Sequence, residues 1–188
     1  MTASPLLRVA LLSMHTDPLC SLGGDVSGGM NVYIRETARV LPTLGVEADV
    51  FTRTADDRSP AISHITPGAR LIRIPAGPKN IIEKNEQARF TGKFASGIRA
   101  FAEMHEIRYD IVSSHYWLSA LAGQELANEW GSPLIHRFHT LAGRKNESLP
   151  QEADRETRDR ATSEIRIARR ADALIASTGA EATDLIYN

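Results

Sequence analysis

Two pairs of polar residues follow short apolar runs, and their side chains could bind a ligand or transfer a proton. His115 and Tyr116 follow Asp110–Ser114 (DIVSS), and His139 and Thr140 follow Pro133–His136 (PLIH). Short apolar runs of this kind are typical of strands buried in a parallel sheet. A single histidine would be explained as ordinary polar loop packing. Two pairs at matching positions instead favour a shared pocket at one edge of a sheet.

A glycine-rich segment, Leu22–Gly29 (LGGDVSGG), precedes a predicted helix. Glycines let the backbone approach an anion, and a helix N-terminus offers unpaired N–H groups. The segment is therefore a candidate phosphate cradle, although a flexible turn with a helix cap explains it equally well. It matches neither the G-x-G-x-x-G fingerprint nor the P-loop, which disfavours binding of dinucleotides or ATP through those motifs.

Basic residues could add positive charge for an anionic ligand: Lys84, Arg144, Lys145 and Arg160. Taken singly, each is explained as a solvated surface side chain. The predicted helix 151–170 carries charges on most faces, so most of them should be solvated, with i,i+4 pairs such as Asp154 with Arg158 and Glu156 with Arg160. A charged residue of this helix that pointed into a cleft would be functional.

The elements that must position these residues alternate between strand and helix. We predict strands at 8–13, 47–52, 70–75, 110–114, 133–136 and 173–177, and helices at 30–44, 90–105, 117–130, 151–170 and 180–187, with a polar loop between the second and third strands. Such alternation predicts an α/β fold with a Rossmann-like, doubly wound, mainly parallel sheet. Ligands of such sheets bind at the carboxyl ends of the strands, so the polar loops 15–31, 77–84, 115–116 and 139–146 should meet at one edge.

Composition limits the class of protein. The chain has 188 residues, 42% of them hydrophobic, and a formal net charge of −1. These values predict one globular domain without the positive field that attracts nucleic acid or anionic membranes. Cys20 is the only cysteine, and no cluster has zinc-site spacing. With no signal peptide and no membrane-spanning segment in the sequence, we expect a cytoplasmic protein.

Three segments resemble a known family: GGMNVYIRETARVLPTLGVEADVFTR, SSHYWLSALAG and HTLAGRKN. They are similar to the sucrose-phosphate synthase and inositol-phosphate glycosyltransferase (mycothiol synthesis) family of retaining glycosyltransferases. The resemblance covers nearly the whole chain. It implies that residues 1–188 are the acceptor-side N-terminal half of a two-domain GT-B fold, with the donor-binding C-terminal domain absent from this chain.

The resemblance also implies roles for individual residues. The Gly28 and Gly29 backbone would contact the donor diphosphate, Asn31 the acceptor ring, and His139 the transferring sugar as the catalytic residue. An acceptor phosphate would be held by four residues: Lys84, Tyr116, Thr140 and Arg160. No metal is implied, and a nucleotide sugar such as a UDP- or GDP-sugar would serve as co-substrate, with no cofactor.

The expected function is transfer of a sugar from a nucleotide sugar to a polyol or sugar acceptor that carries phosphate. This chain alone should be inactive, because its expected partner, the donor-binding domain, is missing. Within the class, a sucrose-phosphate synthase or a mannosyl-type transferase stays open. Outside it, the alternative is a non-catalytic module that binds a sugar phosphate or a nucleotide.

Overall fold

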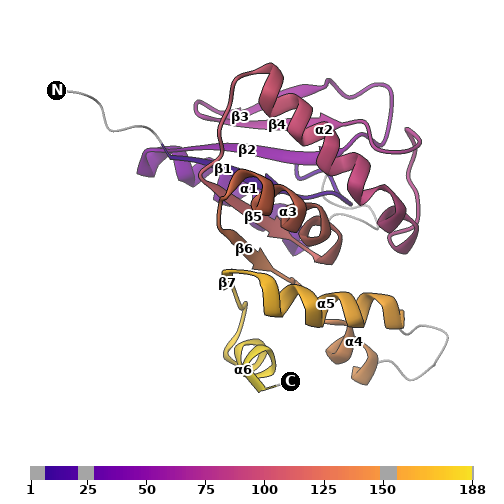
Figure 1. Cartoon of the computed structure of the whole chain (residues 1–188). Helices are drawn as coiled ribbons and strands as arrows, with labels where there is room; N and C mark the ends of the chain where they lie inside the picture. Colours follow the sequence, from indigo (N-terminus) through magenta and orange to yellow (C-terminus); the bar gives the residue numbers. More distant parts are fainter. Residues whose placement is uncertain (1–6, 21–27, 149–155, 188) are drawn as a thin grey trace.

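The computed structural model of the chain describes residues 7–20, 28–148 and 156–187, and these residues contain a seven-stranded sheet (Figure 1). The strand order is β3-β4-β2-β1-β5-β6-β7, and every pairing except that of β3 with β4 is parallel. The strands are β1 (Leu7–Leu12), β2 (Val46–Arg53), β3 (Ile62–Thr66), β4 (Ala69–Ile74), β5 (Ile111–His115), β6 (Leu134–Arg137) and β7 (Ala173–Leu174). The predicted Rossmann-like α/β fold is confirmed.

Helices connect the parallel strands. They are α1 (Gly29–Val40), α2 (Thr91–Met104), α3 (Trp117–Trp130), α4 (Ala142–Ser148), α5 (Arg158–Arg170) and α6 (Gly179–Tyr187), with short 3₁₀ segments η1 (Leu41–Leu44) and η2 (Asn85–Phe90). Figure 1 shows α2, α3 and α5 in succession along one face of the sheet. Within the described part of the chain, no helix has the length and apolar character needed to cross a membrane.

The sheet separates two apolar cores. The larger one packs side chains of α2, α3 and α5, such as Phe94, Leu118 and Ile167, against the sheet. The smaller one packs Ile34 and Ala38 of α1 against β1, β2 and β4. Because both faces are covered, the central strands are buried along most of their length, as is typical of parallel sheets.

The switch in strand order lies at β1, which pairs with β2 on one side and β5 on the other. The chain builds the β2–β4 side of the sheet first and then returns to β5 beside β1. At such a point the connections leave toward opposite faces and open a crevice at the carboxyl ends of the strands. The residues after β1 and β5 therefore lie where ligands bind in this fold class.

Two predicted loops contain regular structure. Ile62–Thr66 forms the antiparallel edge strand β3 inside the polar loop expected between the second and third strands. Ala142–Ser148 forms α4, which begins inside the expected polar loop 139–146 and extends past its end. The first turn of α4 depends on a distant residue, since the Ala142 N–H donates to Glu164 Oε2 at 2.8 Å. No local pattern shows that contact.

The charged helix begins later than expected. Gln151–Arg155 lies outside the described residues, so the predicted pair of Asp154 with Arg158 lies partly outside them too. The helix α5 begins at Arg158, where Thr157 Oγ1 accepts a hydrogen bond from the Arg160 N–H and caps it. The predicted strand 173–177 contains only two strand residues, Ala173 and Leu174.

Candidate functional site

Two adjoining cavities lie at the carboxyl ends of the parallel strands. The first, which we call the strand-end cavity, has a volume of about 560 Å³ and is lined by His15, Thr16, Gly28, Gly29, Met30, Asn31, Tyr33, Lys84, Tyr116, Arg137, His139, Thr140 and Ser177. The second, the side cavity, has a volume of about 890 Å³ and extends beside Arg53 and Arg73. His15, Thr16 and Lys84 line both, so the two cavities meet at these residues.

The strand-end cavity brings together all but one of the site residues that the family resemblance implied. Those that line it are Gly28, Gly29, Asn31, Lys84, Tyr116, His139 and Thr140. The exception is Arg160, which lies behind the cavity wall. Of the glycine-rich segment, only Gly28 and Gly29 fall within the described residues, and Gly29 begins α1. The roles that the family resemblance implies for these residues stay predictions.

Tyr116 and His139 have unusual backbone conformations. Tyr116, directly after β5, has φ of 71° and ψ of 152°, a region occupied almost only by glycine. His139, two residues after β6, has φ of 64°. Such conformations cost about 1–3 kcal/mol each and persist only where the surroundings fix them. Both strained residues line the same cavity.

Contacts within the protein hold Tyr116 and His139 in these backbone conformations. The Tyr116 N–H donates to the Arg137 carbonyl at 3.0 Å, and the Tyr116 ring packs on His15 with centroids 4.4 Å apart. His139 Nε2 shares a hydrogen bond of 3.0 Å with Nδ1 of the fully buried His115. The Tyr33 ring meets the edges of both histidines. The His139 imidazole is therefore held in one orientation.

Four histidines lie in or behind the cavity wall, and we call them the site histidines: His15, His115, His136 and His139. Burial lowers the pKa of His15 and of His136 to about 3. Burial and the nearby Arg137 lower the pKa of His139 to about 4, and burial holds the pKa of His115 well below its ordinary value. At neutral pH all four are uncharged, and the two that line the cavity, His15 and His139, can form hydrogen bonds there without adding charge.

Arg160 supports the cavity from behind. Its side chain is only 1% exposed and pairs with Glu156 Oε1 at 2.8 Å and with Glu164 Oε1 at 2.7 Å. Its Nη2 donates to the Thr140 carbonyl at 2.8 Å and to Thr140 Oγ1 at 3.1 Å. Its guanidinium carbon lies 4.8 Å from the centre of the Tyr116 ring. The predicted pair of Glu156 with Arg160 is confirmed, but it is buried rather than solvated.

Asn31 is buried at the start of α1. Its Nδ2 donates to Thr16 Oγ1 at 2.9 Å and lies 3.3 Å from the Asp17 carbonyl oxygen. Its Oδ1 is buried without a hydrogen-bond partner among the residues that the structure describes. A buried amide oxygen without a partner is uncommon, because it gives up its hydrogen bonds to water. The Asn31 Oδ1 can thus accept a hydrogen bond from a ligand hydroxyl in the cavity.

The charged residues that line the strand-end cavity in the described part of the chain are all cations. No carboxylate is among its lining residues in the described part of the chain, whereas Lys84 and Arg137 both line it. The other predicted cations lie elsewhere: Arg144 pairs with Asp184, and Lys145 of the side cavity pairs with Glu156. The cavity therefore suits an anionic ligand with hydroxyl groups.

Sequence reasoning did not single out several residues of this cavity. His15 follows β1 much as His139 follows β6, so its position after a strand was a usable signal. Tyr33 lies on α1, and Ser177 comes only three residues after β7. Arg137 is the last residue of β6. Within the described ranges, no group of three or more histidines, cysteines and carboxylates could hold a metal ion.

Fold and site together define a class: a doubly wound α/β domain with a cavity at its topological switch point whose lining suits an anionic ligand. Residues 28–187 match the family described as "Glycosyl transferase 4-like domain". The chain belongs to that family, and the predicted glycosyltransferase relationship is confirmed.

Individual relatives agree with the family. The chain is 41% identical over 180 residues to D-inositol 3-phosphate glycosyltransferase of Xylanimonas cellulosilytica and 42% identical over 180 residues to that of Pseudarthrobacter chlorophenolicus. Both matches cover 95% of this chain and 43% of the relative, so the chain spans less than half the length of these curated relatives. The structure of sucrose-phosphate synthase from Thermosynechococcus elongatus is similar too, with a TM-score of 0.88 and 29% identity over 96% of this chain and 44% of that one.

Proposed function

We propose that this chain forms the acceptor-binding half of a retaining glycosyltransferase that moves a sugar from a nucleotide sugar to a phosphorylated polyol. The observation that carries the proposal is the strand-end cavity, which combines cations and neutral hydrogen-bonding groups and has no carboxylate among its described lining residues. The relatives named D-inositol 3-phosphate glycosyltransferase favour an inositol phosphate as the acceptor.

In this proposal the cavity binds both the phosphate and the ring hydroxyls of the acceptor. The phosphate binds beside Lys84, Tyr116 and Thr140, with Arg160 supporting the last two from behind. The ring hydroxyls reach the buried Asn31 Oδ1. Charge-assisted hydrogen bonds to the phosphate supply most of the affinity, because they are stronger than neutral ones.

The donor half of the cleft is supplied by a second α/β unit, and the nucleotide sugar acts as co-substrate without a resident cofactor. Retaining transfer places the acceptor hydroxyl on the same face as the departing diphosphate. The bond from the sugar carbon to the diphosphate oxygen breaks and its electron pair stays on the diphosphate. The acceptor oxygen bonds to that carbon, and its proton ends on the diphosphate.

The chain's own residues contribute position and electrostatics to this step. Its strand-end cavity is lined by neither a carboxylate nor a thiol in the described residues, which fits transfer without a protein nucleophile. His139, neutral and held by His115, orients the sugar through hydrogen bonding. A cytoplasmic location belongs to the same proposal and is supported by the single free cysteine, Cys20.

Calorimetric titration of this chain tests the proposal. The ligands are inositol 3-phosphate, fructose 6-phosphate and unphosphorylated myo-inositol, at low ionic strength. We expect inositol 3-phosphate to bind at least about tenfold more tightly than myo-inositol, since hydrogen bonds to a charged group contribute about 1.5–3 kcal/mol. Tighter binding of fructose 6-phosphate would instead indicate a sucrose-phosphate synthase.

Two lysine variants make the test specific. Lys84→Met should weaken inositol 3-phosphate binding about tenfold or less, because Lys84 is exposed and its charge is partly screened. Lys93→Met removes the same charge from an exposed position on α2 and should leave binding unchanged. Equal binding of phosphorylated and unphosphorylated inositol, or equal effects of the two variants, would refute the acceptor assignment.

A further inference from the structure

Arg137 is a second cation of the strand-end cavity that the proposed function leaves without a role. It ends β6 and is partly buried. Its Nη2 donates to Ser177 Oγ at 2.9 Å, and its guanidinium carbon lies 3.9 Å from the centre of the Tyr33 ring. Among the residues that the structure describes, no carboxylate forms an ion pair with it, and its Nε is buried without a hydrogen-bond partner.

The groups that hold Arg137 are fixed by their own contacts. The Ser177 N–H donates to Glu181 Oε2 at 2.6 Å, while the Glu181 N–H donates to Thr178 Oγ1 at 3.1 Å. The Thr178 hydroxyl thus caps the start of α6, and Glu181 ties the Ser177 backbone to the same helix. The Tyr33 ring on α1 packs against both His115 and His139. Three elements therefore fix one guanidinium in advance of any ligand.

An arginine held in this way suits a phosphate group. The guanidinium is planar, always charged and able to donate several parallel hydrogen bonds, and stacking on an aromatic ring leaves its edge free for an anion. A partly buried cation without a counter-ion loses hydration, and the hydrogen bond to Ser177 and the stack on Tyr33 replace it only in part, since Nε has no partner in the described protein. An anionic ligand in the cavity would replace it.

Of the two cations that line the strand-end cavity, only Lys84 also lines the side cavity. Lys84 lines both cavities and lies where they meet. Arg137 lines only the strand-end cavity, together with Gly28 and Gly29 at the start of α1, and it packs on Tyr33 of that same helix. Two separate cations suit two separate phosphate-bearing ligands, as in a transfer from a nucleotide sugar to a phosphorylated acceptor.

We propose that Arg137 binds the diphosphate of the nucleotide sugar, together with the Gly28–Gly29 backbone at the N-terminus of α1. This inference rests on the proposed function and adds a donor ligand from the acceptor-side half. In the transfer step Arg137 stabilises the negative charge that grows on the diphosphate as its bond to the sugar breaks. The nearby His139 stays neutral because burial lowers its pKa, so it does not attract the diphosphate by charge.

The test titrates this chain with inorganic pyrophosphate and, separately, with inositol 3-phosphate at low ionic strength. Arg137→Gln should weaken pyrophosphate binding about tenfold or more, because a lost hydrogen bond to a charged group costs about 1.5–3 kcal/mol and 1.4 kcal/mol is tenfold. Arg137→Lys keeps the charge but not the planar stack on Tyr33, so it should give an intermediate loss. Binding of inositol 3-phosphate should change less than about twofold in both, as expected for a separate site.

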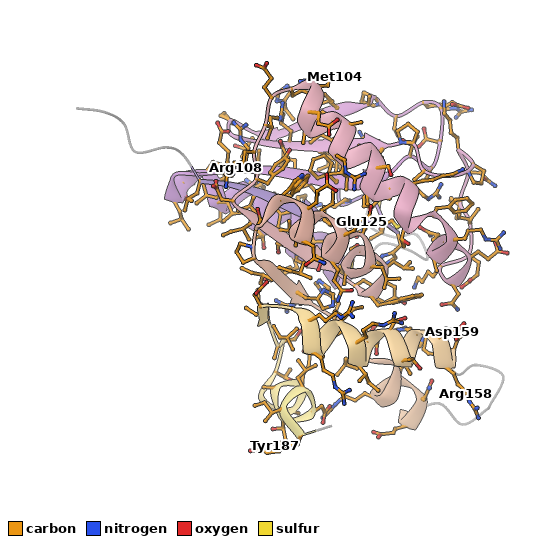
Figure 2. The ribbon with its side chains drawn as sticks, in the orientation of Figure 1. Met104, Arg108, Glu125, Arg158, Asp159 and Tyr187 are labelled. Atoms are coloured by element: carbon orange, nitrogen blue, oxygen red, sulfur yellow. The ribbon has the colours of Figure 1, made fainter. Side chains whose placement is uncertain are left out.

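Arg108→Gln is the matched control. Arg108 is exposed and precedes β5, whereas the cavity lies beyond the carboxyl end of that strand, and Figure 2 labels it beside the sheet. This variant has the same change in net charge and should bind pyrophosphate like the unchanged chain. If it weakens pyrophosphate binding as much as Arg137→Gln does, the effect is one of net charge and the proposal fails.

A second measurement takes its readout from the unchanged chain. In the unchanged chain, pyrophosphate should shift the NMR signal of the Arg137 Nε–H, which is buried without a partner and is assigned by its loss in Arg137→Lys. No shift, or an Arg137→Gln variant with unchanged pyrophosphate affinity, overturns the proposal. So does equal weakening of both ligands, which indicates one common anion site.

The outcome separates this inference from the proposed function. If pyrophosphate binding depends on Arg137 but inositol 3-phosphate does not bind at all, the acceptor assignment fails and the diphosphate site stands. If inositol 3-phosphate binds through Lys84 while pyrophosphate is indifferent to Arg137, the acceptor assignment stands and Arg137 is not a donor ligand.

Discussion

Replacing Arg160 by methionine should destabilise the whole C-terminal part of the cavity. The side chain is 1% exposed and joins Glu156, Glu164 and Thr140 by direct hydrogen bonds or ion pairs, with Tyr116 stacked over it. Methionine fills a similar volume but removes the only charge that compensates the buried Glu164 in the described contacts. The variant thus leaves a carboxylate in a site that excludes water.

The size of the effect follows from that geometry. Breaking a buried ion pair by removing one partner costs about 3–5 kcal/mol, because the remaining charge stays buried. Total stabilities are about 5–15 kcal/mol, so this is a large share. For a chain of this length each kcal/mol lowers Tm by about 2–4 °C, which gives a loss of about 6–20 °C. Burial raises the pKa of Glu164, while the hydrogen bond from the Ala142 N–H and the charge of Arg160 lower it. Loss of Arg160 should therefore raise the pKa of Glu164 further.

Urea unfolding followed by circular dichroism measures the loss, with two variants for comparison. Arg158→Met changes an exposed arginine at the first position of the same helix, labelled in Figure 2, and should cost less than about 1 kcal/mol. Adding Glu164→Gln to Arg160→Met removes the stranded carboxylate and should recover part of the stability. The amide oxygen of Gln can still accept the Ala142 N–H.

Two results would contradict this reasoning. One is a loss below about 1 kcal/mol for Arg160→Met, the range of solvent-exposed ion pairs. The other is a double variant that is less stable than Arg160→Met alone, because an uncompensated carboxylate would then not be the cause.

Two further predictions concern stability. The site histidines bind protons in the unfolded chain near pH 6.5, whereas burial lowers their pKa in the folded chain, to about 4 for His139 and about 3 for His15 and His136. Stability is therefore retained above pH 6.5 and falls as the pH drops from about 6.5 toward those values, by about 1.4 kcal/mol per pH unit for each fully titrating histidine. Acid titration followed by circular dichroism should show steep unfolding near pH 5, and a flat stability between pH 7 and pH 5 would be inconsistent with neutral buried imidazoles. Gly97→Ala would place Cβ 2.3 Å from Cγ2 of the buried Ile74 and should cost about 1–3 kcal/mol in thermal unfolding. Gly92→Ala on the same helix meets nothing within 4 Å and serves as its control, so equal Tm values for the two variants would exclude the clash.

The parts of the fold that depend on local patterns could be predicted from the sequence. Parallel strands buried on both faces give continuous apolar runs, and β1, β2, β4, β5 and β6 were found for that reason. The edge strand β3 was missed because its residues are exposed or only partly buried and show no buried face. The helix α4 was missed because its first N–H is satisfied by Glu164, which lies far along the chain.

The predicted face of α1 illustrates a second limit. Apolar residues at roughly helical spacing, Val32, Ile34, Val40 and Leu41, predict the helix 30–44. In the structure Val32 and Val40 are exposed while Asn31 is buried. The polar residue is inside because the loop after β1 supplies partners for its amide. Hydrophobic periodicity located the helix correctly and misjudged its orientation. A pattern of apolar residues gives no signal for a polar side chain, such as that of Asn31, that is buried where it lines a cavity.

The candidate site could be located from strand ends, yet its charges could not be assigned. Counting basic residues placed Arg144 and Lys145 on the same footing as Lys84 and Arg160 and passed over Arg137. In the structure Arg144 and Lys145 pair with carboxylates, and Arg160 lies in a buried network. A cation that can bind a ligand differs from a structural one because no carboxylate of the protein pairs with it. Arg144 and Asp184 lie far apart in the sequence, so the sequence alone does not show that they pair.

The strain at Tyr116 and His139 links these observations to function. Each follows a strand whose continuation would carry the backbone past the edge of the sheet, and a positive φ instead redirects the chain close to the strand end. The cost is offset by contacts on the far side of each residue, with His15 and Arg160 for Tyr116 and with His115 for His139. All of those contacts lie within the protein itself, so the protein's own packing fixes the cavity walls. Most of the binding energy of an anionic acceptor can then go into affinity and alignment, with little spent on ordering the site.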